Sequence, residues 1–79
     1  MKTLADFVKA KRKEVRMTQI EFAQRAGVAL TVVRKIEQGK QNLNLGAVNK
    51  VLKMFGHMLV PVSIREIDPK ENNETKDEV

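Results

Sequence analysis

Two short apolar-patterned segments, each ended by a glycine, lie in the middle of the chain and limit what it can fold into. The first segment opens with Thr18, and Glu21 follows at the spacing of a capping box. In that motif the threonine hydroxyl accepts a hydrogen bond from one free N–H group, and the glutamate accepts from another. Gly27 stands where a helix needs a residue with positive φ to stop. The pattern predicts a helix over residues 19–26.

The second segment predicts a helix over about residues 30–38, ended by Gly39. Val33 and Ile36 have the spacing of a buried helix face. Ala29 precedes the segment and is a poor N-cap, because its methyl group cannot accept a hydrogen bond. Two short helices joined by a tight turn with glycine are typical of a helix-turn-helix.

Further helices are predicted on both sides of this motif. The first covers about residues 4–15 and has a basic outer face with Lys9, Lys13 and Arg16. The last covers about residues 45–55, and Asn44 precedes it as an N-cap. Its apolar stripe consists of Leu45, Val48, Leu52 and Phe55, and Gly56 ends it.

After Gly56 the apolar period changes from that of a helix to that of a strand. One face of the predicted strand carries Met58, Val60, Val62 and Ile64. Pro61 marks an edge strand, because it has no N–H group to donate. A lone strand cannot satisfy its backbone, so we expect two copies to pair across a homodimer. The alternative is an extended tail that packs on the helices.

Charge is distributed unevenly along the chain. Residues 1–67 hold 13 lysines and arginines and 5 acidic residues, a net charge of +8, whereas residues 68–79 hold 2 and 5, a net charge of −3. A basic body favours an anionic partner such as DNA or RNA, although a solvated charged surface is the plainer interpretation. The acidic tail lacks apolar periodicity, and we expect it to be disordered.

Several classes of function are disfavoured by the composition. There is no cysteine and one histidine, so we expect no disulfide and no metal site. His57 has no nucleophile or metal-binding partner nearby in the sequence, so we expect neither catalysis nor a cofactor. No apolar run is long enough for a membrane span or a secretory leader, and we expect a cytoplasmic, nucleoid-associated protein.

The stretch MTQIEFAQRAGVALTVVRKIEQGK resembles the Xre or phage-repressor branch of the helix-turn-helix family. Ala23 is the small residue where the two helices cross, and apolar residues stand where the family has them, at Phe22, Ala26, Val28, Val33 and Ile36. The resemblance covers about residues 4–55. It implies a mainly α, lambda-repressor-like domain of four to five helices, here with one C-terminal strand added.

The resemblance also implies how the motif meets DNA, with the second helix in the major groove of operator DNA. Base-contacting positions are then Ala29, Leu30, Thr31, Arg34 and Lys35. Phosphate-contacting positions are Thr18, Gln19, Lys40, Asn42 and Asn44. Relatives often have glutamine or serine at the reading positions, so Leu30 departs from the pattern and favours apolar contact over hydrogen-bonded readout. Its alternative is a role in packing.

One charged pair is implied to be structural. In repressors of this family an arginine of the first helix pairs with a glutamate that ends the reading helix, and Arg12 and Glu37 match those positions. A partly buried bidentate pair would hold the two helices together.

The order of a helix-turn-helix domain, a strand and a short polar tail resembles the HipB-type antitoxins. It implies a DNA-binding domain over residues 1–56, a dimerisation strand over residues 57–67 and an acidic tail over residues 68–79. It further implies a repressor of its own operon in a toxin–antitoxin system, with a HipA-like kinase toxin as partner. The alternatives are a stand-alone Xre repressor and a protein-interaction adaptor that has lost DNA binding.

Overall fold

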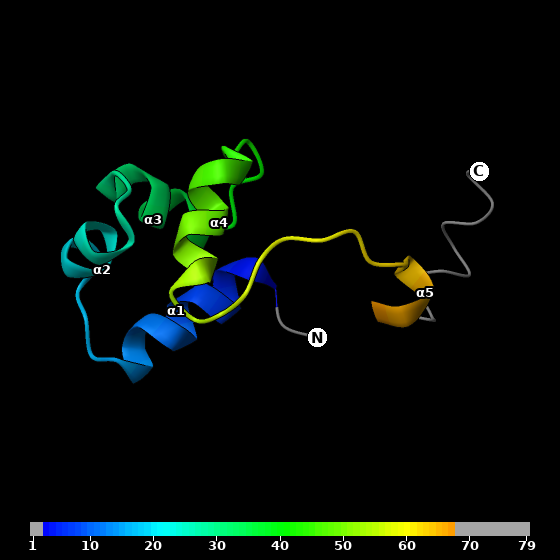
Figure 1. The fold of residues 1–79 in the computed structure, drawn as a ribbon, viewed down its shortest axis with the longest axis horizontal. Coiled ribbons are helices and arrows are strands. Elements are labelled where there is room, and N and C mark those ends of the chain that lie inside the picture. Colours follow the sequence, from blue (N-terminus) through cyan, green and yellow to red (C-terminus); the bar gives the residue numbers. More distant parts are fainter. Residues whose placement is uncertain (1–2, 68–79) are drawn as a thin grey trace.

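A computed structural model describes residues 3–67, and four of its helices pack around one core (Figure 1). The helices are α1 (Leu4–Glu14), α2 (Gln19–Ala26), α3 (Leu30–Glu37), α4 (Leu45–Lys53) and α5 (Ile64–Ile67). The bounds of α1 to α4 agree with the sequence-based predictions to within two residues. In the described part, no helix has the length and apolar character needed to cross a membrane.

Side-chain caps fix where three of the helices begin. The hydroxyl oxygens of Thr3 and Thr18 and the amide oxygen of Asn44 each accept from a backbone N–H three residues later, at 3.0 to 3.1 Å. Thr18 also takes part in the predicted capping box, because its backbone N–H donates to Glu21 at 2.9 Å. Ala29 makes no such bond, so α3 begins without a side-chain cap.

The four longer helices end in one common motif, a residue with positive φ flanked by two backbone hydrogen bonds to the last turn. Gly27, Gly39 and Gly56 hold this position after α2, α3 and α4, with φ between 71° and 76°. After α1 the position is held by Arg16, with φ of 56°. The flanking bonds run from Arg16 N–H to the Lys13 carbonyl and from Met17 N–H to the Arg12 carbonyl. A non-glycine residue in this conformation costs about 1 kcal/mol.

The core lies where α1 to α4 meet. It consists of Val8, Phe22, Ala23, Val33, Ile36, Val48, Val51 and Leu52. Phe22 is fully buried and its ring stacks on Phe55 at 5.7 Å between centroids. The stripe predicted for α4 needs one correction: Leu45 is 68% exposed, because the first turn of α4 extends past the core, and Val51 is buried in addition.

The predicted strand does not form within the single chain, and no strand occurs among residues 3–67. Residues 57–63 leave the helices in an extended course, and Ile64 begins the helical turn α5 instead of ending a strand (Figure 1). Among the described residues, two N–H groups of this segment donate to the body of the domain: that of His57 to the Leu52 carbonyl at 3.0 Å and that of Leu59 to the Asn49 side chain at 2.8 Å. The predicted disordered tail lies outside the described residues.

The conformation of Gly27 generates a prediction about stability. A Cβ at this position would meet no atom within 4 Å, so the cost of Gly27→Ala comes from the backbone conformation and not from a clash. We expect a loss of about 1 kcal/mol, which lowers the thermal midpoint of a domain this size by about 4–8 °C. Calorimetry measures this shift, and an unchanged midpoint would contradict the proposed role of the left-handed turn.

Candidate DNA interface

The outer face of α3 is polar and basic. Thr31, Arg34 and Lys35 are all exposed, whereas Val33, Ile36 and Glu37 are buried on the opposite side of the same helix. Neither Arg34 nor Lys35 forms an ion pair with any residue in the described range. α3 therefore presents hydrogen-bond donors and positive charge to solvent on one side while its other side is held in the core.

The two residues at the start of α3 differ from each other in their surroundings. Ala29 is exposed and leaves the first N–H groups of the helix without a side-chain acceptor. Leu30 is half-buried and packs against the core. Much of the Leu30 side chain is thus occupied within the domain, which leaves Thr31 as the most accessible side chain in the first turn of α3.

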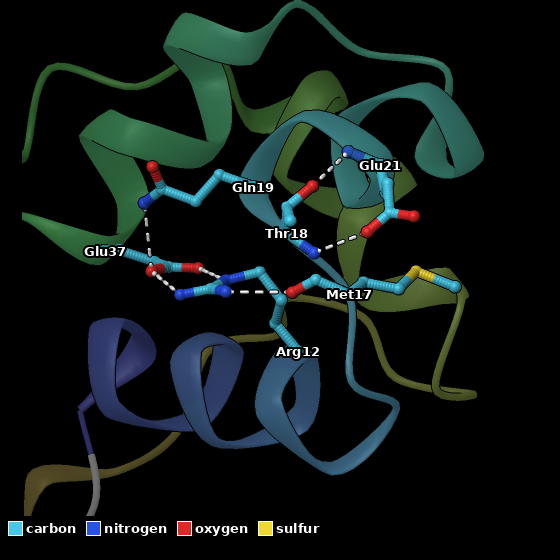
Figure 2. A network of polar contacts seen from close by, with 6 residues as sticks. All are labelled: Arg12, Met17, Thr18, Gln19, Glu21 and Glu37. Carbon is cyan, nitrogen blue, oxygen red and sulfur yellow. Dashed lines mark hydrogen bonds and ion pairs between the residues drawn. The ribbon is translucent and has the colours of Figure 1, made fainter.

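The Arg12 guanidinium joins three elements at the base of α3 (Figure 2). Its Nε and one Nη donate to the two carboxylate oxygens of Glu37 at 2.7 and 3.0 Å, and its other Nη donates to the Met17 carbonyl at 2.9 Å. The Glu37 side chain is only 4% exposed and the Arg12 side chain 15%. The predicted pair is therefore present and bidentate, and it ties α1 and the α1–α2 connection to the end of α3.

Gln19 completes this network from the start of α2. Its side-chain amide donates to the same Glu37 oxygen as one Nη of Arg12, at 3.1 Å (Figure 2). This contact could not be predicted from the sequence, because the two residues are separated by 18 positions and glutamine pairs with many partners. In the structure, the Gln19 amide nitrogen thus uses one of its two N–H donors within the domain.

These contacts shift the protonation equilibria of the pair. Burial of the Glu37 carboxylate raises its pKa, but hydrogen bonds from Arg12 and Gln19, together with the charges of Arg12 and Lys9, outweigh burial and hold the pKa below its usual range. The hydrogen bond to Glu37 raises the pKa of Arg12. Both groups are therefore charged at neutral pH, and each provides hydrogen-bond partners and a counter-charge for the other.

The other predicted phosphate-contacting residues lie at the start of α2, at the start of α4 and in the connection between α3 and α4. Thr18 caps α2 with its hydroxyl, and Asn44 caps α4 with its amide oxygen. Lys40 and Asn42 are exposed in the connection between α3 and α4. Lys40 also donates its backbone N–H to the Lys35 carbonyl at 3.0 Å, which places it directly after the basic end of α3.

A comparison with protein families fits this geometry. The model of the helix-turn-helix family matches residues 8–56, from the middle of α1 to the glycine that follows α4. Since this is more than half of the chain, the protein belongs to that family, whose Xre-type members are DNA-binding transcription regulators. No curated protein and no solved structure matches the chain.

The Arg12–Glu37 pair predicts a pH-dependent stability. Because the pKa of Glu37 is lower in the folded state than in the unfolded state, its contribution is present above the unfolded pKa of about 4.3 and is lost as pH falls through the folded value. We expect Glu37→Gln to lower the free energy of unfolding by about 1–3 kcal/mol at pH 7, and by progressively less below about pH 4.

Urea unfolding at a series of pH values measures this difference. Glu14→Gln is the matched control, because it removes an exposed ion pair with Lys11 at 3.6 Å and should change stability by less than about 0.5 kcal/mol. Equal stability of Glu37→Gln and the wild type at pH 7 would show that the pair does not hold α3.

Proposed function

We propose that this protein is a sequence-specific transcriptional repressor that inserts α3 into the major groove of double-stranded operator DNA, without catalysis or a cofactor, in the cytoplasm. The observation that carries the proposal is the outer face of α3. Its exposed donors lack partners among the described residues, while the opposite face is fixed by the core and by the Arg12–Glu37 pair. Such a helix can enter a groove as a rigid element.

The chemistry of that face suggests what it reads. Lys35 and Arg34 can donate to the O6 and N7 atoms of guanine, and the Thr31 methyl group can contact the C5-methyl group of thymine. Ala29 can approach the same bases closely, whereas Leu30 contributes mainly to packing. Lys40 and Asn42 can hold the phosphate backbone, which fixes register without reading sequence.

We also propose that the protein binds as a homodimer formed by residues 57–63. Met58, Val60 and Val62 are 66%, 59% and 49% exposed, and their backbone N–H groups have no acceptor within the described part. In an extended segment these three N–H groups point to one edge, whereas Leu59 N–H points to Asn49 and Pro61 has no N–H. The open edge can therefore pair with the same edge of a second copy.

A HipB-type antitoxin role is the more specific form of this proposal, with a HipA-like kinase toxin carried by the DNA-bound dimer. Its support is the sequence resemblance together with the apolar segment after α4. A stand-alone Xre repressor is the alternative. Co-expression with the product of a neighbouring kinase-like gene separates the two, because an antitoxin forms a complex of defined stoichiometry and a stand-alone repressor forms none.

Selection of duplexes from a random library, followed by anisotropy titration, tests DNA reading. We expect one enriched motif, with an affinity that falls as salt rises, because each neutralised phosphate adds about 0.9 to the slope of log K against log salt. Equal affinity for enriched and random duplexes at moderate salt would contradict the repressor function.

Lys35→Ala distinguishes base reading from phosphate binding. If Lys35 donates to a guanine, the variant loses about 1–3 kcal/mol of binding free energy on the enriched duplex and little on random DNA. Anisotropy on both duplexes measures the difference. An equal loss on both would assign Lys35 to the backbone. Lys53→Ala, at an exposed position of α4, is a matched control for the loss of one charge.

Val60→Asp tests the dimer. A buried carboxylate on each strand of the pair would be costly, so we expect a monomer with an unchanged thermal midpoint for the helical domain. Analytical ultracentrifugation measures the mass. Wild-type protein that sediments as a monomer, or a variant that remains a dimer, would overturn the pairing of residues 57–63.

A further inference from the structure

Arg16 occupies a backbone conformation that the rest of the chain gives to glycine. Each of the four longer helices ends at a residue with positive φ, and three of these residues are glycines. Arg16 is the single non-glycine residue with positive φ among residues 3–67. The motif itself does not need an arginine, since Gly27, Gly39 and Gly56 form the same pair of flanking hydrogen bonds.

No contact within the described residues accounts for this arginine. Its side chain is exposed, forms no hydrogen bond and forms no ion pair there, in contrast to Arg12 four positions earlier. Strained residues persist where the strain serves a function or where the surroundings impose it. The flanking hydrogen bonds impose the backbone conformation at this position, but no contact among the described residues requires an arginine side chain there. A contact with a partner outside the domain would account for the arginine.

The position of Arg16 relative to α3 is fixed. The carbonyl of the next residue, Met17, accepts a hydrogen bond from the Arg12 guanidinium, which also donates to Glu37 at the end of α3 (Figure 2). Thr18, the cap of α2, follows Arg16 by two residues, so the Cα atoms of Arg16 and Thr18 are at most about 7 Å apart. The backbone that carries the Arg16 side chain is therefore held in a constant register with α3, the helix that we propose to read DNA.

We propose that Arg16 binds a DNA phosphate beside the start of α2. This contact is the reason why the end of α1 has an arginine where the ends of α2, α3 and α4 have a glycine. The inference rests on the DNA binding proposed above. It makes Arg16 a backbone-positioning residue whose loss affects all duplexes alike. It also predicts that stability and affinity change in opposite directions when the side chain is removed.

The test uses the full chain, a mixed-sequence duplex and a series of salt concentrations. We expect Arg16→Gly to raise the thermal midpoint by a few degrees, because the strain is relieved. The same variant should bind the duplex about five- to tenfold more weakly in 0.1 M salt, with a salt slope smaller by about 0.9. Arg16→Lys should keep the wild-type slope, since it retains the charge.

Arg65→Gln is the matched control, because it removes one positive charge on α5 and should leave the salt slope unchanged. If the wild type binds the duplex and Arg16→Gly binds it equally well with the same slope, the inference is wrong while DNA binding stands. If Arg65→Gln weakens binding as much as Arg16→Gly does, the effect is one of net charge and the inference is likewise wrong. Absence of duplex binding by the wild type would instead overturn the proposed function itself.

Discussion

The bidentate pair between Arg12 and Glu37 is the interaction on which the arrangement of this domain depends. A buried carboxylate at the end of α3 would be unfavourable without it, and the same guanidinium also holds the Met17 carbonyl. One cation thus joins α1, the α1–α2 connection and α3, and Gln19 adds α2 to the set. Apolar burial brings the four helices together, and this polar network adds directional contacts that oppose rotation and sliding of α3. This restraint matters for the proposed insertion of α3 into a groove, because a rotation by a fraction of a turn would present Val32 or Leu30 in place of Thr31 and Lys35.

The ends of the helices contribute the second constraint. Caps at Thr3, Thr18 and Asn44 begin helices at defined residues, and a left-handed residue ends each of the four longer ones. Short helices with fixed ends leave little freedom in the connections, so a domain of this size can hold α2 and α3 at one angle. Arg16 is the one non-glycine residue with positive φ at these ends, and it lies in the α1–α2 connection, where Arg12 donates to the Met17 carbonyl.

Most of the helix boundaries could be predicted from the sequence, because they depend on residues close to one another in the chain. The capping box at Thr18, the stops at Gly27, Gly39 and Gly56, and the Asn44 cap all depend on neighbours within a few positions, and all are present. The Arg12–Glu37 pair followed from family resemblance, and it is present too. Contacts between residues far apart in the sequence were harder to predict. No residue near Gln19 indicates its hydrogen bond to Glu37. Leu45 fits the apolar stripe of α4 but is exposed, because its turn extends past the core. The strand after Gly56 illustrates a different limit. Its alternating pattern is local, but strand pairing needs a second strand, and residues 3–67 contain none.

The outer face of α3 and the connections at its base form the surface that we propose to meet DNA. Backbone amide chemical shifts of the labelled protein, recorded as an enriched duplex is added, test it most directly. We expect the largest changes at Thr31, Arg34 and Lys35, with smaller ones over residues 16–19 and 40–44. Changes concentrated instead on the outer face of α4, with α3 unaffected, would contradict it.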